Sequence, residues 1–148
     1  MVAVKAWHHT SLAVADLDWT VTFYCAAFGF RLAFDERGMT REIRSMTGRE
    51  RLACDLAMLS SPHAGQMLEL IAFRGGGKDL ALPLAAGAGH IAFEGADLDK
   101  ALGEVMRLGA RPIGAVTSFP EGRATYCREP GGSFFELEEL HDQSWAKG

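Results

Sequence analysis

The stretch GHIAFEGADLD (residues 89–99) repeats in outline an earlier stretch, HHTSLAVADLD (residues 8–18). Both end in Ala-Asp-Leu-Asp, and each carries a histidine, His9 or His90, seven residues before the first of these aspartates. Each then runs into a segment of helical spacing that stops at a glycine, Gly29 or Gly109. A unit that occurs twice in one chain predicts a duplicated architecture, and the matched histidines indicate a site where the two copies meet.

The composition is that of an ordinary globular protein, with 148 residues, 48% hydrophobic and 23% charged residues and a formal net charge of -4. This length predicts one domain over residues 1–148. A mildly acidic chain without a basic tail is a poor candidate for binding nucleic acid. The apolar runs are too short to span a bilayer and the N-terminus lacks a charged and apolar leader, so we expect no membrane partner.

The three cysteines lack the spacing of a disulfide or metal-binding framework. Cys25, Cys54 and Cys127 are therefore expected to be reduced thiols that serve as core or structural residues. An odd number of scattered cysteines is typical of a cytoplasmic protein, which is the location we expect.

Hydrophobic periodicity divides the chain into two modules of the same order, a strand, a helix and three strands. Module one covers about residues 6–74 and module two about residues 89–141, with a glycine- and alanine-rich linker at residues 75–88. Helices are expected after Asp16 and Asp97, whose side chains suit helix N-caps. Two βαβββ modules side by side predict an α+β domain with a mixed, largely antiparallel sheet.

The first expected strand, residues 6–14, has two different faces. Strand alternation places His9, Ser11 and Ala13 on one face and bulky Leu12 on the other. Small residues beside His9 leave room for a ligand, whereas His8 is expected to point away from that face.

Residues 37–51 form a polar, arginine-rich excursion with two interpretations. Five arginines could clamp an anionic substrate such as a carboxylate, a thioester nucleotide or a glutathione conjugate: Arg37, Arg41, Arg44, Arg49 and Arg51. The interspersed acidic residues Glu36, Glu42 and Glu50 favour a solvated hairpin instead.

Each module also carries a glutamate in its closing strand, Glu69 before Leu70 and Glu136 before Leu137. A lone carboxylate in an apolar strand is costly to bury unless it is paired, protonated or bound to a metal. A two-fold arrangement would bring these glutamates to a common centre with His9 and His90. Two imidazoles and two carboxylates suit one divalent ion of borderline hardness, with open positions for water or substrate.

Four further polar residues indicate where the chain meets solvent. Glu138 and Glu139 suggest that the last strand approaches solvent. His63 lies in a predicted turn and His141 lies near the end of the chain, so both are expected to be exposed.

The chain resembles the vicinal oxygen chelate superfamily, which includes glyoxalase I, methylmalonyl-CoA epimerase, extradiol dioxygenases and bleomycin- and fosfomycin-resistance proteins. The resemblance covers roughly residues 6–141 and depends on HTSLAVADL (9–17), Phe23-Tyr24, Gly29, LEL (68–70), GHIAF (89–93), Asp97-Leu98 and EPGGSFFEL (129–137). It implies paired βαβββ modules that form a cupped sheet around a metal. The family's metal ligands fall on His9, Glu69, His90 and Glu136. The turn at residues 129–133 departs slightly, with Glu129, Gly131 and Ser133 at positions where aspartate or asparagine is usual.

The resemblance also implies a reaction. Glutamate at position 69 favours a glyoxalase I-like lyase or an epimerase or isomerase over ring cleavage. In the resemblance, extradiol dioxygenases have a His, His, Glu triad of metal ligands and no ligand at this position. In such a site the ion (Ni, Zn, Co, Mn or Fe) acts as a Lewis acid and stabilises an enediolate. Glu136 is the first candidate for the base that removes the proton next to the carbonyl, Glu69 the second and a metal-held water the third.

Two other functions stay open at this stage. One is an extradiol-type ring-cleaving dioxygenase that uses His9 or His90 with Glu136, and the other is a non-catalytic small-molecule binding or antibiotic-resistance protein. Members of the family commonly form homodimers, so the site could lie within one chain or across two.

Overall fold

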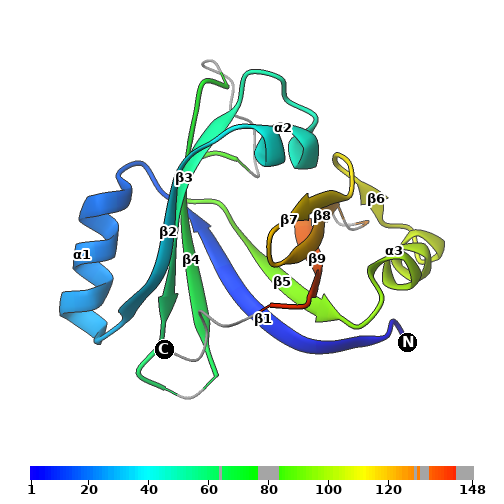
Figure 1. Ribbon diagram of the computed structural model, residues 1–148, viewed down its shortest axis with the longest axis horizontal. Helices are drawn as coiled ribbons and strands as arrows, with labels where there is room; N and C mark the ends of the chain where they lie inside the picture. Colours follow the sequence, from blue (N-terminus) through cyan, green and yellow to red (C-terminus); the bar gives the residue numbers. More distant parts are fainter. Residues whose placement is uncertain (64, 77–83, 129, 131–133, 143–148) are drawn as a thin grey trace.

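The computed structural model describes residues 1–63, 65–76, 84–128, 130 and 134–142 (Figure 1). The first module contains β1 (Val4–Ala13), α1 (Leu17–Phe28), β2 (Arg31–Met39), α2 (Arg41–Thr47), β3 (Ala53–Ser60) and β4 (Met67–Arg74). The second contains β5 (Gly89–Gly95), α3 (Leu98–Arg107), β6 (Arg111–Pro112), β7 (Thr117–Phe119), β8 (Gly122–Arg128) and β9 (Phe134–Leu140). The middle of the expected linker (77–83) and most of the expected turn at 129–132 lie outside the described residues.

The strands form one mixed sheet in the order β2-β3-β4-β1-β5-β9-β8-β6, with β7 paired to β8. β1 pairs with β4 in parallel and β5 pairs with β9 in parallel, so each module repeats the same local topology. The two modules join where β1 and β5 run antiparallel at the centre of the sheet. Figure 1 shows α1 and α3 on opposite outer sides and the sheet curved between them. The predicted α+β class with a mixed sheet is confirmed.

Both outer helices begin at the predicted caps, and α1 also ends at the predicted glycine, whereas the C-cap of α3 is Leu108, one residue before Gly109. The Asp16 carboxylate accepts a hydrogen bond from the Trp19 backbone N–H at 2.9 Å, and Asp97 accepts one from Lys100 at 3.0 Å. Gly29 ends α1 in the left-handed conformation, with φ 72°. Each helix packs on the outer face of its own module, α1 against a cluster that includes Leu59 and Leu70, and α3 against Leu137.

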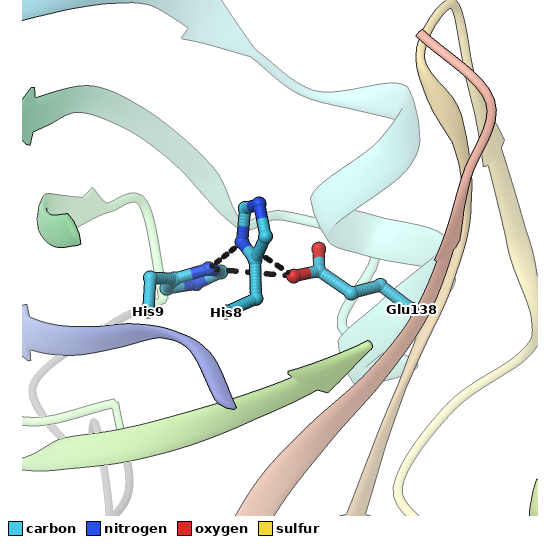
Figure 2. A group of neighbouring side chains, drawn as sticks. All are labelled: His8, His9 and Glu138. Atoms are coloured by element: carbon cyan, nitrogen blue, oxygen red, sulfur yellow. Dashed lines mark hydrogen bonds and ion pairs between the residues drawn. The ribbon is translucent and has the colours of Figure 1, made fainter. Parts of the chain in front are cut away.

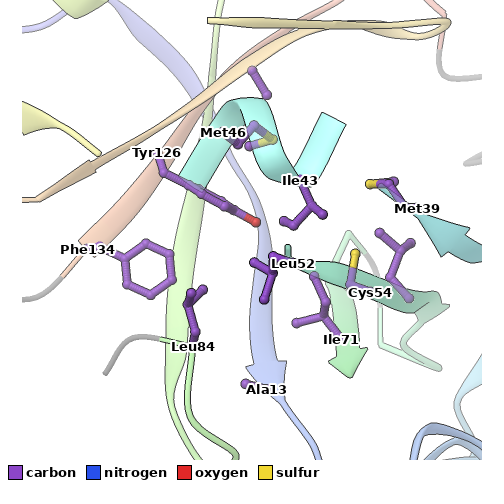
Figure 3. Packing of buried hydrophobic residues seen from close by; sticks show 12 residues of the cluster. Ala13, Met39, Ile43, Met46, Leu52, Cys54, Ile71, Leu84, Tyr126 and Phe134 are labelled. Carbon is purple, nitrogen blue, oxygen red and sulfur yellow. The ribbon is translucent and has the colours of Figure 1, made fainter. Parts of the chain in front are cut away.

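The interpretation of residues 37–51 as a solvated hairpin is wrong, because this segment contains the end of β2 and helix α2. Ile43 and Met46 lie three residues apart on α2, and their exposed fractions are only 1% and 2%. Both point into the cluster that contains Met39 and Leu52 (Figure 3). Burial of this apolar stripe outweighs the polar character that the arginines give the segment.

Helix α2 also ties the two modules together on the inner side of the sheet. Its Ser45 carbonyl accepts a hydrogen bond from the Ala115 N–H at 2.9 Å, and the Ser45 hydroxyl accepts one from Thr117 at 2.8 Å. A helix from the first module therefore fixes the loop and short strand that precede β8 in the second.

All three cysteines are free thiols, and two of them belong to the core. Burial raises the pKa of Cys54 to about 12 and that of Cys127 to about 11, so both stay protonated at neutral pH. None of the helices in the described part of the chain has the length and apolar character needed to cross a bilayer.

The close approach of β1 and β5 depends on Gly89. A Cβ atom at this position would lie 2.8 Å from the Ser11 carbonyl oxygen and 3.2 Å from the Leu12 side chain. We expect Gly89→Ala to lower the free energy of unfolding by about 1–3 kcal/mol, because the central strands must move apart. Urea unfolding measures this change.

Gly103, inside α3, is the matched control because a Cβ atom there meets only the end of the Arg107 side chain at 3.7 Å. Gly103→Ala should stabilise the protein by about 0.5–1 kcal/mol through helix propensity. Equal unfolding midpoints for Gly89→Ala and the wild type would contradict this account of the central pairing.

Candidate metal centre

Strand register brings polar residues from both modules to one face of the central strands. Ser11 on β1 lies opposite Glu69 on β4 and opposite His90 on β5. Residues directly opposite on neighbouring strands share a face, so these three side chains project together. The small Ser11 separates the two larger side chains and leaves space between them.

The same register brings the other two predicted residues to this face. Ala92 on β5 lies opposite His9 on β1 and opposite Glu136 on β9. Ala92 is fully buried and small, which lets the longer side chains of its two neighbours reach across it. The four residues predicted from the sequence thus come together within one chain, and no second copy is required to assemble them.

The four side chains are buried and close to one another. The Nε2 atom of His90 lies 3.1 Å from an oxygen of Glu136, and the Nε2 atom of His9 lies 3.5 Å from the same oxygen. His9 Nε2 is 4.0 Å from Glu69, whose other oxygen accepts a hydrogen bond from the Ser11 hydroxyl at 2.8 Å. Glu136 therefore lies between the two imidazoles, while Glu69 lies to one side.

The charges of this group depend on one another. Burial lowers the pKa of His9, but contacts with Glu136 and Glu138 outweigh burial, and the pKa is raised well above its usual value. Burial raises the pKa of Glu136, but His9 and His90 outweigh that effect, and the pKa falls to about 2. Without a metal, the carboxylate is therefore ionised at neutral pH and holds a proton on its imidazole partner.

These residues fit a divalent metal ion. Ligand atoms of His9, His90 and Glu136 all lie within 4.8 Å of one another. The His9 Nε2 atom is buried, and among the described residues it finds no hydrogen-bond partner of normal geometry. A buried nitrogen without such a partner is costly, and a cation between the three ligands would satisfy it. Glu69 is near enough to approach the same ion as a further ligand.

Two aromatic residues that the sequence analysis did not single out hold the His90 ring. Its centroid lies 4.6 Å from the ring of Phe134 and 5.2 Å from that of Tyr126. Phe134 is two residues before Glu136 on β9, and this spacing was a usable signal because alternate residues of a strand share a face. Tyr126 is found only through the register that places it opposite Glu136.

Two predictions about neighbouring polar residues are wrong. His8 does not point away, because the pairing of β1 with β5 shifts between Trp7 and His9 and leaves His8 as the extra residue of a bulge. Glu138 does not face solvent: it has an exposed fraction of 6% and lies on the same face as Glu136. Figure 2 shows His8, His9 and Glu138 directed toward one another. The exposed positions expected for His63 and His141 are confirmed.

A pocket opens above this group and has mostly apolar walls. His9, Glu69 and Glu136 line it together with side chains from both modules, among them Phe34, Met39, Met46, Met58, Ile71 and Phe119. Arg123 is the arginine among its lining residues, and it is engaged by Asp99 and Glu139.

The five arginines of residues 37–51 do not line this pocket. Arg37 pairs with Asp18 and Asp35, and Arg41 pairs with Glu42. The segment therefore does not clamp an anion in this pocket, although Arg49 lines a separate pocket together with Arg128.

Comparison with known proteins identifies the family. The sequence profile of the glyoxalase/bleomycin resistance protein/dioxygenase superfamily matches residues 6–137, so the chain belongs to this superfamily. No curated protein sequence matches the chain significantly.

Solved structures with the same fold include methylmalonyl-CoA epimerases. The enzyme from Mycobacterium tuberculosis is 19% identical, with a TM-score of 0.72 over 99% of this chain and 95% of that one. A variant of the Streptomyces coelicolor enzyme in complex with 2-nitronate-propionyl-CoA is 21% identical, with a TM-score of 0.60 over 95% of this chain and 100% of that one. At these identities the comparisons establish the fold.

The centre predicts opposite pH trends for zinc binding and for the stability of the metal-free protein. Zinc must displace the proton on His9, so its apparent affinity should rise with pH until the raised pKa of His9 is passed. Protonated His9 stabilises the metal-free protein below the unfolded pKa of about 6.5, and this stabilisation is lost as pH rises through the folded pKa. Chelator-buffered zinc titrations and urea unfolding measure the two trends.

The variant His90→Ala removes a ligand and leaves the His9–Glu136 pair in place. It should weaken zinc binding at this centre at least tenfold, because losing even a residue that orients a ligand typically lowers metal affinity by about that factor. His63→Ala is the control because His63 is exposed and lies in the turn between β3 and β4. Equal affinities in both variants would show that zinc binds elsewhere.

Proposed function

We propose that the protein is a divalent-metal-dependent enzyme that moves a proton on the carbon next to a carbonyl group, giving isomerisation or epimerisation. The observation that supports this most is the grouping of His9, His90 and Glu136 with a second carboxylate, Glu69, beside a pocket that His9 and both glutamates line. A cationic centre beside a basic carboxylate is the combination that such a reaction needs.

The ligands in this proposal are His9, His90 and Glu136, with Glu69 as the fourth. A divalent ion bound there would supply Lewis-acid chemistry, polarising a substrate carbonyl and stabilising the enediolate that develops as the proton leaves. The aromatic contacts of His90 keep its ring in place, since Phe134 and Tyr126 pack against it. We also propose a cytoplasmic location and a homodimer, although the centre does not need the second copy.

Glu69 is the stronger candidate for the group that moves the proton. Glu136 has one oxygen in contact with both imidazoles, at 3.1 and 3.5 Å, and these contacts hold it in a position that suits a ligand. Glu69 is 4.0 Å from the nearest imidazole nitrogen and is held by one neutral hydrogen bond from Ser11. It can therefore approach the substrate while Ser11 restricts its orientation. This reverses the order expected from the sequence, which put Glu136 first.

The pocket favours a substrate with an apolar body next to its carbonyl. Its walls carry methionine and phenylalanine side chains, which adapt well to acyl groups. The similar structures bear the names of enzymes that act on or bind acyl-CoA compounds. Acyl-CoA thioesters branched next to the carbonyl are thus the first substrates to test, and thiol adducts of 2-oxoaldehydes, for lyase activity, the second.

The Glu69→Gln variant tests the assigned role. Glutamine keeps an oxygen for the metal but cannot accept the proton, so exchange of the substrate proton with deuterated solvent should fall about 10²–10⁴-fold. Zinc affinity should stay within about tenfold of the wild type. The measurement is deuterium incorporation followed by mass spectrometry, with methylmalonyl-CoA as the probe.

Glu50→Gln is the control for this variant because Glu50 is an exposed carboxylate. It should exchange the substrate proton at the wild-type rate. Unchanged exchange in Glu69→Gln, together with loss in Glu136→Gln at full metal content, would return the basic role to Glu136.

A ring-cleaving dioxygenase is the second candidate, and one observation favours it. The tight group of His9, His90 and Glu136 is a two-histidine, one-carboxylate set, which in other proteins binds Fe(II) and leaves positions open for oxygen and substrate. This function would give oxygen uptake with catechols in the Fe(II)-loaded protein. Glu69→Gln should leave that uptake unchanged, since the triad does not include Glu69.

A further inference from the structure

A second group of ligand atoms lies on the other side of the His9 ring. The Nδ1 atom of His8 is 2.8 Å from the Nδ1 atom of His9 and 2.7 Å from a Glu138 oxygen. The same Glu138 oxygen is 3.5 Å from His9 Nδ1. Figure 2 shows this triangle, and the three side chains have exposed fractions of only 8%, 2% and 8%.

Hydrogen bonds alone do not satisfy the triangle. A ring nitrogen carries either one proton or one lone pair, so His8 Nδ1 cannot serve both close neighbours well. The Glu138 oxygen is buried and finds no hydrogen-bond partner of normal geometry among the described residues, although two ring nitrogens lie within 3.5 Å of it. All three atoms can offer lone pairs, and a cation at their centre would accept them.

The spacing of the three atoms also matches metal coordination. Ligands about 2.0–2.1 Å from a zinc ion lie about 2.9 Å apart in octahedral geometry and about 3.4 Å apart in tetrahedral geometry. The observed separations are 2.7, 2.8 and 3.5 Å. Two imidazoles and one carboxylate suit zinc, copper, nickel or cobalt better than calcium or magnesium.

We propose that His8, His9 and Glu138 form a second divalent-metal site that shares the His9 ring with the first. His9 Nδ1 faces the second site, and its Nε2 faces His90 and Glu136. When both ions are bound, the ring bridges them as imidazolate and its remaining proton goes to solvent. The second site goes beyond the proposed reaction, since the first centre and its chemistry do not require it.

The charges of the two sites balance. Two divalent ions bring four positive charges, and Glu69, Glu136, Glu138 and the bridging imidazolate bring four negative charges. Near neutrality is what a buried polar group needs, because an uncompensated charge is strongly disfavoured there. His8, His9 and Glu138 also line the pocket next to the first centre, so an ion at the second site could take water or a substrate oxygen from it.

Zinc stoichiometry tests the second site. Metal-free protein dialysed against chelator-buffered zinc should bind about two zinc ions per chain, measured by mass spectrometry. His8→Ala and Glu138→Gln should each keep about one, and His90→Ala should keep about one at the second site. His63→Ala is the matched control and should keep about two. The ion that each variant retains reports that its fold is intact.

Copper provides a signal that depends on the shared ring. In wild-type protein loaded with Cu(II), the EPR intensity should fall below that expected from the copper content, because the two ions couple through the His9 ring. In His8→Ala and Glu138→Gln the intensity and the copper content should agree.

Three results would overturn the second site. In the first, the wild-type protein binds about one zinc ion, and neither His8→Ala nor Glu138→Gln changes the stoichiometry or the affinity. The second is a single zinc ion whose affinity both variants weaken, which would mean that these residues only orient His9. The third is a second zinc ion that persists in both variants and therefore lies elsewhere on the protein. The proposed reaction fails separately, if His90→Ala leaves proton exchange unchanged.

Discussion

The antiparallel pairing of β1 with β5 is the constraint on which the rest of the structure depends. It joins the two modules into one sheet and sets Ser11 opposite His90, while the parallel pairing of β1 with β4 sets the same serine opposite Glu69. A slip of one residue would turn His90 to the outer face of the sheet, where α1 and α3 pack. The duplicated sequence therefore produces a site only because this register is held, and Gly89 permits the close approach.

The buried carboxylates of this site need positive charge close to them. The two histidines and two glutamates of the first centre are almost completely buried. Glu138 adds a further buried carboxylate nearby. A proton on His9 supplies compensating charge in the metal-free protein, because its carboxylate neighbours raise the pKa of this imidazole. A divalent ion held by His9, His90 and Glu136 would replace that proton and would supply Lewis-acid chemistry next to the pocket. Stability and chemistry thus depend on the same few contacts.

Much of the fold could be predicted because the signals were local or repeated. The helix caps Asp16 and Asp97 could be predicted because a cap depends only on the few residues around it. The matched histidines could be predicted because the same short pattern occurs twice in the chain. Helix α2 was missed because its apolar stripe, Ile43 and Met46, is short and lies among arginines. The bulge at His8 was missed because it depends on pairing with a strand some eighty residues away. Strand alternation alone therefore gave the wrong side for His8, and with it concealed the triangle with Glu138.

Anomalous diffraction at the zinc edge, from crystals of zinc-loaded protein, would locate the ion bound by the two histidines and Glu136. We expect a peak about 2.0–2.2 Å from His9 Nε2, His90 Nε2 and a Glu136 oxygen, with all three ligands from one chain. A map with no peak among these atoms, or a peak whose ligands come from two different chains, would contradict this expectation.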